Sequence, residues 1–125
     1  MQRRVDTEVV DQDFGGKRQI WRTFFARTMV KPIITLTTDF GVGSRYVAAM
    51  KGAVFCVNRE VLVVDLTHGI PPQDIATGAQ VLADTCLEFP VGTIHVAVVD
   101  PGVGTRRKIV YGEIARHYFV APDKG

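Results

Sequence analysis

The feature that most restricts the fold of this sequence is a regular alternation of short apolar segments with amphipathic helical patterns. Residues 33–38, 61–66 and 94–99 are apolar or β-branched over the length of a strand. Apolar side chains recur between them at spacings of three and four, as on one face of a helix. These side chains are Val47, Met50, Val54 and Val57, and then Ile75, Ala79, Leu82 and Cys86. Strands that are apolar on both faces and alternate with helices predict an α/β domain with a mostly parallel sheet flanked by helices.

Acidic residues stand at the ends of the three predicted strands. Asp39 and Asp100 directly follow the first and third strands, and Asp65 lies in the last residues of the second. In sheets of this kind, ligands bind beyond the carboxyl ends of the strands. Three carboxylates on one rim are costly unless they serve a ligand, a metal or one another. We therefore expect the functional site at this rim.

Two turns on the rim carry residue types that suit a binding site. Residues 39–44, Asp-Phe-Gly-Val-Gly-Ser, place two glycines in a strand-to-helix turn, where backbone N–H groups can approach a ligand. A plain tight turn with Ser44 capping the helix explains the same pattern. In residues 100–108, Asp100 is followed by three basic residues at the end of the loop. An Asp–Arg pair can orient a water molecule or hold an anion. A solvated basic turn between two strands is the alternative there.

Composition and charge exclude several classes of function. With 46% hydrophobic and 22% charged residues, the 125-residue chain has the profile of one soluble domain. No apolar run approaches the roughly 18 residues of a membrane-spanning helix. Residues 33–125 hold eight Lys and Arg against nine Asp and Glu, so no basic face for nucleic acid is expected. The turn at 39–44 lacks the full glycine spacing of a dinucleotide site and the lysine of a P-loop.

Cysteine and histidine positions give no metal or disulfide signal. Cys56 and Cys86 are thirty residues apart without a CxxC pair, so we expect two buried free thiols in a reducing cytoplasm. Asp65 and His68 have the spacing of half a metal site, but further ligands at suitable spacing are not evident. We expect His68 to fix a loop through a hydrogen bond. Residues 109–114 and 118–120 predict a final hairpin around Arg116 and His117.

Residues 1–32 differ from the rest of the chain. They show no clean helical or strand period and mix seven Lys and Arg with four Asp and Glu. The segment lacks the apolar centre of a secretory signal, and its acidic residues disfavour a transit peptide. We interpret it as a poorly ordered extension or a wrongly assigned leader, since Met29 lies just before the first strand. A short helix over residues 19–27 is the alternative.

Seven segments of the sequence together resemble one protein family. They are ITLTTDFG at 34–41, YV at 46–47, MKG at 50–52, VDLTH at 64–68, IPPQDI at 70–75, GTIHVAVVDPGVGT at 92–105 and PD at 122–123. In this order and spacing they are similar to the SAM hydroxide adenosyltransferases, which are S-adenosylmethionine hydrolases related to fluorinating and chlorinating enzymes. The resemblance covers about residues 33–125, and its most specific motif is the DPGVGT at 100–105.

The resemblance implies a fold, an assembly and a reaction. It implies an α/β N-terminal domain, here incomplete, followed by a smaller β-rich domain that this sequence does not include. It also implies a homotrimer with active sites between neighbouring subunits. The implied reaction is attack of water on the ribose C5′ of S-adenosylmethionine, which releases adenosine and methionine. No metal or cofactor is implied, and S-adenosylmethionine is the small-molecule partner.

The resemblance also assigns roles to individual residues. Asp100 and Arg107 match two members of an Asp–Arg–His set that holds and activates the attacking water. The family's His follows a later Pro-Asp-Asn-Gly motif, so His95 and His117 do not match it. Substrate-binding positions fall on Asp39, Phe40, Ser44, Gln73 and Asp123.

The sequence departs from the family at two of its motifs. Ser44 stands where many relatives carry an Asp that, in the halogenating enzymes, holds the ribose hydroxyls. Lys124 replaces the Asn of Pro-Asp-Asn-Gly and brings a cation toward a pocket for a cationic sulfonium. These departures bear on ribose contact and on charge in the pocket.

Three functions follow, in order of preference. The first is hydrolysis of S-adenosylmethionine, with this chain as the N-terminal piece of the enzyme. The second is a remnant that binds S-adenosylmethionine or adenosine, or oligomerises, without turnover. The third is halogenation at the same carbon, which Asp100 disfavours because a carboxylate repels a halide yet accepts a hydrogen bond from water.

The interpretation of residues 1–32 leads to a stability prediction. Because the segment has no amphipathic period, deleting residues 1–28 should leave the melting temperature nearly unchanged. Thermal unfolding of the two chains, followed by circular dichroism, measures this. A drop of several degrees on deletion would mean that the segment packs on the domain.

Overall fold

The structure, a computed structural model, describes residues 30–123. The chain divides between Lys31 and Pro32 into two units, and the description below concerns the second. The prediction for residues 1–32 falls almost entirely on residues 1–29, which lie outside the described residues. That prediction therefore stays open.

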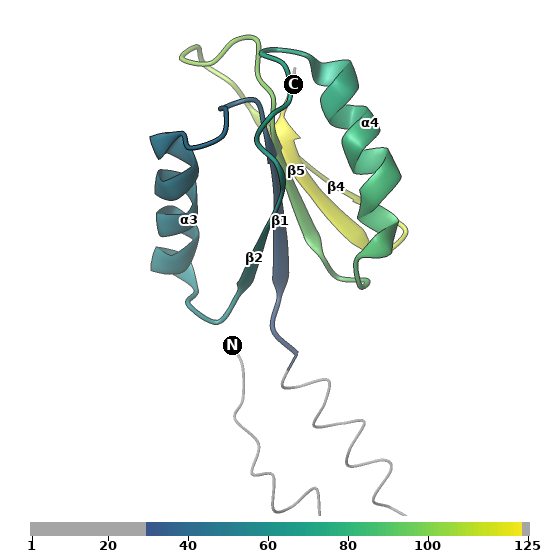
Figure 1. The fold of residues 1–125 in the computed structure, drawn as a ribbon. Coiled ribbons are helices and arrows are strands. Elements are labelled where there is room, and N and C mark those ends of the chain that lie inside the picture. Colours follow the sequence, from purple (N-terminus) through teal and green to yellow (C-terminus); the bar gives the residue numbers. More distant parts are fainter. Residues whose placement is uncertain (1–29, 124–125) are drawn as a thin grey trace, which may run out of the picture. The chain divides into compact units, whose positions relative to one another are not determined.

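A mixed five-stranded sheet forms the centre of the domain (Figure 1). Its strands are β1 (Ile33–Thr38), β2 (Leu62–Thr67), β3 (Ile94–Val98), β4 (Ile109–Ile114) and β5 (His117–Pro122). They lie in the order β2-β1-β3-β5-β4, and all neighbours are parallel except the antiparallel pair β4 and β5. The predicted α/β class, the mostly parallel sheet and the final hairpin are confirmed.

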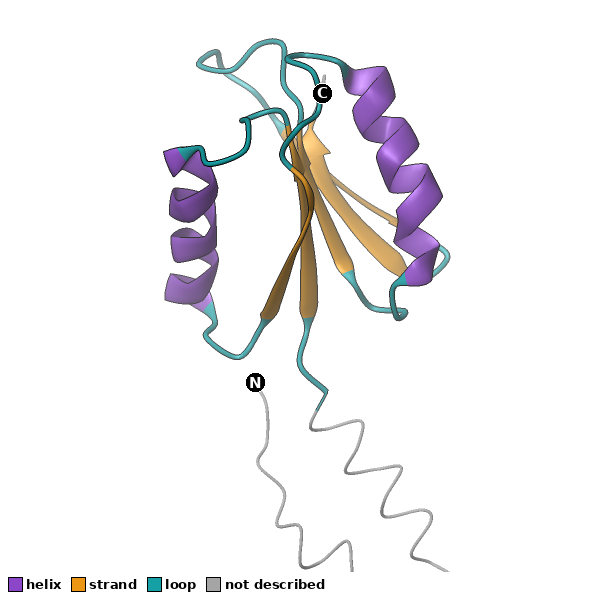
Figure 2. Ribbon diagram, in the orientation of Figure 1, coloured by secondary structure: helices purple, strands orange, loops and turns teal. Residues whose placement is uncertain are grey.

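Two helices cover opposite faces of the sheet (Figure 2). They are α3 (Arg45–Val57) and α4 (Ile75–Thr85), and a 3₁₀ turn, η1 (Cys86–Glu88), continues α4. The Ser44 hydroxyl caps α3 by accepting from the Tyr46 N–H at 3.2 Å, as the sequence predicts. Asp74 caps α4 by accepting from the Thr77 N–H at 3.0 Å. Among residues 30–123, neither helix has the length and apolar content that crossing a membrane requires.

Strand β1 is the most buried element, because strands pair with both of its edges and helices lie over both faces. Leu36 and three threonines of this strand have no exposed surface. Helix α4 approaches the sheet closely at Gly78, which has no side chain. A Cβ atom on Gly78 would stand only 3.1 Å from Val99 Cγ2. The carboxyl ends of β1 and β3 lie side by side, because the two strands pair in parallel up to Thr38 and Val98.

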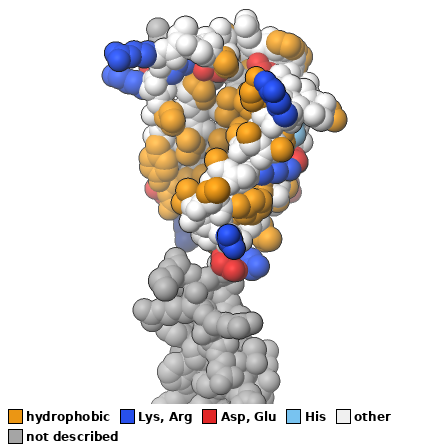
Figure 3. Space-filling view, turned by 90° about the vertical axis from the view of Figure 1, so that its left-hand side faces the viewer, with side chains coloured by type: hydrophobic (Ala, Val, Ile, Leu, Met, Phe, Trp, Pro, Cys, Tyr) orange, Lys and Arg blue, Asp and Glu red, His pale blue; other side chains and the backbone are white. Residues whose placement is uncertain are grey.

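The outer helix α3 corrects two predictions. It contains no buried residue, and Val57 of the predicted inner stripe is 89% exposed because it is the last residue of the helix. The other residues of the predicted inner stripe are half-buried rather than fully buried; they are Val47, Met50 and Val54. Cys56 is exposed, contrary to the prediction of two buried thiols, whereas Cys86 is buried. Figure 3 shows hydrophobic side chains gathered over this face of the domain.

Two buried histidines lie at the amino ends of β3 and β5, opposite the carboxyl ends of these strands. His95 Nδ1 is 2.7 Å from the Thr35 hydroxyl, and its Nε2 is 3.1 Å from Nδ1 of His117. The His95 ring stacks on the rings of His117 and Phe119, with centroids 5.3 and 5.1 Å apart. Both histidines are buried. Burial, with a smaller contribution from His117, holds the pKa of His95 below its usual value.

This histidine pair predicts loss of stability in acid. Because the pKa of His95 is lower in the folded chain than in the unfolded chain, protons bind preferentially to the unfolded state. The stability from neutral His95 is fully present above pH 6.5 and is lost as the pH falls through the folded pKa. His95→Gln keeps hydrogen-bonding groups but does not titrate there, so its denaturant stability should fall less steeply between pH 7.5 and 5. An equal slope in both proteins would contradict the assignment.

Candidate active site

Asp100 and Arg107 meet at the carboxyl end of β3, at the two ends of one loop. Asp100 is 8% exposed, and its Oδ1 lies 3.1 Å from Arg107 Nη1. The same oxygen accepts a hydrogen bond from the Gly102 N–H at 2.8 Å. The structure thus brings together the two residues for which the sequence predicts a catalytic role.

The loop between them is folded onto the arginine. Arg107 Nε donates to the Gly102 carbonyl at 3.2 Å and to the Thr105 hydroxyl at 3.4 Å. Thr105 in turn donates its hydroxyl hydrogen to the Gly102 carbonyl at 2.7 Å. Gly102 must lack a side chain, because a Cβ atom there would overlap Arg107 Nη2. The glycine therefore makes room for the guanidinium and holds it at the same time.

Arg107 Nη1 has hydrogen-bonding capacity to spare. This nitrogen is buried and stands at ion-pair distance from Asp100, but it makes no aligned hydrogen bond among the described residues. A guanidinium N–H that is fixed, desolvated and incompletely bonded can donate to a bound water or an anionic group. This is the chemical capacity that the sequence predicts for the loop.

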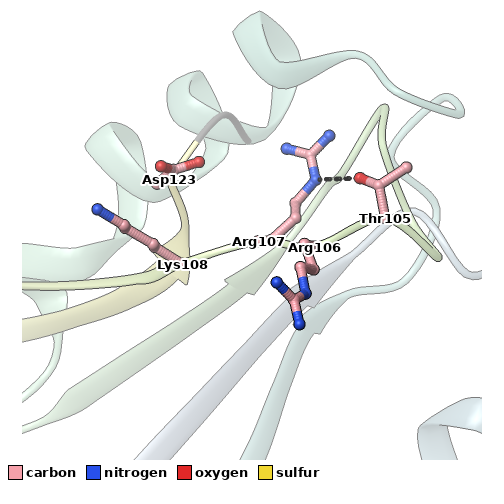
Figure 4. Close-up of a pocket in the computed structure, with 5 residues that line it drawn as sticks. All are labelled: Thr105, Arg106, Arg107, Lys108 and Asp123. Atoms are coloured by element: carbon pink, nitrogen blue, oxygen red, sulfur yellow. Dashed lines mark hydrogen bonds between the residues drawn. The ribbon is translucent and has the colours of Figure 1, made fainter.

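An open hollow of about 590 Å³ lies beside the loop (Figure 4). It is lined by Thr105, Arg106, Arg107, Lys108 and Asp123. In Figure 4 the two arginines point to opposite sides of the chain, and Lys108 and Asp123 lie next to each other. Asp123 is brought here because its N–H donates to the Lys108 carbonyl at 3.0 Å. One of the predicted substrate-binding residues therefore shares this hollow with Arg107.

A second pair of predicted residues joins two other loops of the rim. Asp39 Oδ2 accepts a hydrogen bond from the Gln73 N–H at 2.8 Å. Gln73 has φ = 64°, a backbone conformation that is costly for a residue with a side chain. Such strain persists where the surroundings fix the backbone, often at a binding site. This hydrogen bond ties the turn after β1 to the loop before α4.

Phe40 and Ser44 lie on the same turn as Asp39. The Phe40 ring contacts the Tyr46 ring, with centroids 5.9 Å apart. The Ser44 hydroxyl accepts from the α3 backbone as a cap, so its oxygen is engaged while its hydrogen remains free to donate. The capping interpretation of this turn is confirmed, and it leaves Ser44 one hydrogen bond for a ligand.

Asp65 has partners of its own and lies within β2, two residues before the end of the strand. It forms an ion pair with Lys51 at 2.7 Å, and its Oδ1 lies 3.0 Å from His68 Nε2. The hydrogen bond from Lys51 is the main cause that lowers the pKa of Asp65, and His68 adds to it. His68 also hydrogen-bonds the Thr38 hydroxyl at 2.8 Å, which confirms its predicted role in fixing a loop.

The sequence did not single out Gly102 and Thr105 individually. Both lie in the motif at 100–105, but their support of Arg107 depends on how the loop folds back, which spacing alone does not show. In the part of the chain that the structure describes, no three His, Cys, Asp or Glu side chains are grouped to hold a metal ion.

Comparison with known proteins gives a consistent result. The model of the SAM hydroxide adenosyltransferase N-terminal domain matches residues 34–125. An (R)-S-adenosyl-L-methionine hydrolase from Methanocaldococcus jannaschii is 42% identical over 106 residues, which are 81% of this chain and 40% of that protein. A fluorinase from Nocardia brasiliensis is 34% identical over 85 residues, 68% of this chain and 28% of that protein.

A solved structure also has this fold. A conserved hypothetical protein from Thermus thermophilus aligns with a TM-score of 0.65 and 40% identity. The alignment covers 75% of this chain and 39% of the Thermus protein. The chain therefore spans about two fifths of the length of the hydrolase and of the solved structure that it matches.

The contact between Gly102 and Arg107 predicts a specific mutant effect. In Gly102→Ala the new methyl group should displace the guanidinium and separate it from Asp100, and the melting temperature should fall because the buried carboxylate loses its partner. The Arg107 Nε–H signal in an NMR exchange measurement should then exchange at least severalfold faster. Gly112→Ala is the matched control, because nothing lies within 4 Å of a Cβ atom there. Unchanged exchange in Gly102→Ala would show that Arg107 does not depend on this glycine.

Proposed function

The chain belongs to the SAM hydroxide adenosyltransferase family, and on that premise we propose that the protein carrying it hydrolyses S-adenosylmethionine to adenosine and methionine. The observation that supports this most directly is the buried pair of Asp100 and Arg107 at the strand ends. The pair joins a hydrogen-bond acceptor to a fixed cation with an unused donor. Those are the groups that can hold one water molecule in a defined orientation.

The proposed reaction is a displacement at carbon. The oxygen of water forms a bond to the ribose C5′ while the bond from C5′ to the sulfonium sulfur breaks. The sulfur keeps that electron pair and becomes the neutral thioether of methionine, and the water proton is released. Because the sulfonium is already a good leaving group, the protein needs mainly to position the water and exclude other nucleophiles. The proposed chemistry therefore includes neither a metal nor a cofactor.

Asp100 and Arg107 act on the water in this proposal. Asp100 accepts a hydrogen bond from it, so that negative charge grows on the oxygen as it attacks C5′. Arg107 keeps the carboxylate oriented and donates from Nη1 to the same water. The Gly102 N–H holds the Asp100 oxygen from the other side. Both side chains thus favour the transition state more than the bound substrate.

The other rim residues bind the substrate in this proposal. Asp39 uses one oxygen for Gln73 and offers the other to a ribose hydroxyl. Ser44 donates its remaining hydrogen to the ribose, and the half-buried Phe40 ring offers a face for the base. Asp123, beside Lys108, attracts the positively charged part of the substrate.

We also propose the assembly and compartment that the family resemblance implies. The protein forms a homotrimer with active sites between subunits, and the exposed apolar side chains of α3 are available for such contacts. It acts in the cytoplasm, where the free thiols of Cys56 and Cys86 stay reduced. Light scattering of the purified protein measures the number of subunits.

Product analysis tests the reaction and separates its alternatives. In water enriched in ¹⁸O, hydrolysis should place the label on the adenosine 5′ oxygen and leave methionine unlabelled. A 5′-halo-5′-deoxyadenosine formed in the presence of halide would instead make the protein a halogenase. This alternative is tested because one of the relatives is a fluorinase. Saturable binding of adenosine with no turnover would identify a binding protein.

The roles of Asp100 and Arg107 predict a particular kinetic pattern. In the enzyme that carries this chain, Asp100→Asn and Arg107→Ala should each lower kcat about 10²- to 10⁴-fold, the usual effect of losing a positioned acid or base. Substrate binding should change much less, because both groups act on the water. The double variant should be little worse than either single one.

Steady-state kinetics and calorimetric binding of S-adenosylmethionine measure these effects. Arg59→Ala, which removes an exposed cation from the turn between α3 and β2, is the control and should match the unaltered enzyme. Weaker binding with unchanged kcat in both site variants would assign Asp100 and Arg107 to substrate binding instead.

A further inference from the structure

A chain of polar contacts leads from helix α3 to the turn that carries Asp39. Lys51 Nζ lies 2.7 Å from Asp65 Oδ2, and Asp65 Oδ1 lies 3.0 Å from His68 Nε2. His68 Nδ1 is 2.8 Å from the Thr38 hydroxyl, which accepts from the Phe40 N–H at 3.3 Å. The contacts therefore connect α3, β2 and the end of β1, and they end on the backbone of the turn.

The inner part of this chain is buried and the outer part is open to solvent. Thr38 has no exposed surface, and the side chain of His68 is 10% exposed. The side chains of Lys51 and Asp65 are 33% and 38% exposed. His68 Nε2 stands near Asp65 without an aligned hydrogen bond, whereas Nδ1 is hydrogen-bonded to Thr38. The contact through Nδ1 is therefore the one that fixes the turn.

His68 also holds the turn through its backbone. Its carbonyl accepts from the Gly41 N–H at 2.8 Å. Gly41 has φ = 91°, so the chain reverses at this point in a conformation that favours glycine. Two successive N–H groups, those of Phe40 and Gly41, are thus held by one histidine, the first through Thr38 and the second directly.

We infer that His68 is a positioning residue for the turn at residues 39–41, an inference that rests on the proposed function. His68 does not line the hollow beside Arg107. It acts through Thr38, which fixes the backbone between Asp39 and Phe40. The direction of the Asp39 carboxylate and of the Phe40 ring toward adenosine depends on that backbone.

One set of hydrogen positions accounts for all of these contacts. Because the Thr38 oxygen accepts from Phe40, its own hydrogen is available for His68 Nδ1. In this arrangement Nδ1 accepts from Thr38, and the hydrogen on Nε2 faces Asp65. The Asp65 carboxylate favours a hydrogen on Nε2, and Lys51 balances the charge of Asp65 from the solvent side.

Matched variants test the role of each ring nitrogen. His68→Asn places an amide near the position of Nδ1, whereas His68→Gln places it near Nε2. Thr38→Val removes only the hydroxyl and keeps the shape, and Thr38→Ser keeps the hydroxyl. The readouts are amide hydrogen exchange at Phe40, which does not depend on any activity, and calorimetric binding of adenosine to the enzyme that carries this chain and to each of its variants.

We expect His68→Gln and Thr38→Val to raise Phe40 exchange and the adenosine Kd about three- to tenfold, the effect of losing one hydrogen bond. His68→Asn and Thr38→Ser should stay within about twofold of the unaltered chain. The double variant His68→Gln with Thr38→Val should resemble the single ones. A purely structural role would instead lower the melting temperature of all four variants without this pattern of rescue.

Three results would overturn the inference. Unchanged Phe40 exchange in Thr38→Val would show that the hydroxyl does not hold the turn. Faster exchange with unchanged adenosine binding would show that the turn does not position the ligand. Binding of neither adenosine nor S-adenosylmethionine by the enzyme that carries this chain would refute the proposed function, and the positioning role with it, while the exchange data would still report whether His68 orders the turn.

Discussion

The burial of β1, complete from Thr35 to Thr38, is the constraint on which the rest of this structure depends. Its backbone is paired on both edges, by β2 and β3, and its side chains are covered on both faces. After this central strand the chain emerges from the sheet at the carboxyl end of β1, and the parallel strand β3 ends at the same edge. The turn at 39–41 and the loop at 100–107 are neighbours for this reason, although they are far apart in the sequence.

Burial of polar groups is the cost of this arrangement. Thr35, Thr38, His95 and His117 lie inside the domain, and each makes a side-chain hydrogen bond within it. A buried polar group without a partner costs roughly 1–3 kcal/mol, so these contacts define one arrangement of the strands. The histidines stabilise opposite ends of the sheet. His95 and His117 hydrogen-bond to each other at the amino ends of β3 and β5, whereas His68 hydrogen-bonds to Thr38 at the carboxyl end of β1.

Each carboxylate of the rim has partners of its own. Asp39 accepts from the Gln73 backbone, Asp65 pairs with Lys51 and His68, and Asp100 pairs with Arg107. Asp100 differs from Asp65 in being buried, at 8% exposed against 38%, and in pairing with a guanidinium whose Nη1 lacks an aligned hydrogen bond. This difference in surroundings, rather than the residue type, is what makes Asp100 the proposed catalytic carboxylate.

The sequence by itself determined the class of fold and the order of strands and helices along the chain, and it offered the cap at Ser44 and the pairing of Asp100 with Arg107 each as one of two interpretations. These depend on local spacing and on a short loop, so neighbouring residues carry the signal. The tertiary structure alone decided the strand order, the exposure of Val57 and Cys56, the bond from Gln73 to Asp39, and the support of Arg107 by Gly102. Each of these depends on atoms brought together from distant segments or by a loop that folds back on itself, and a one-dimensional pattern does not encode that approach.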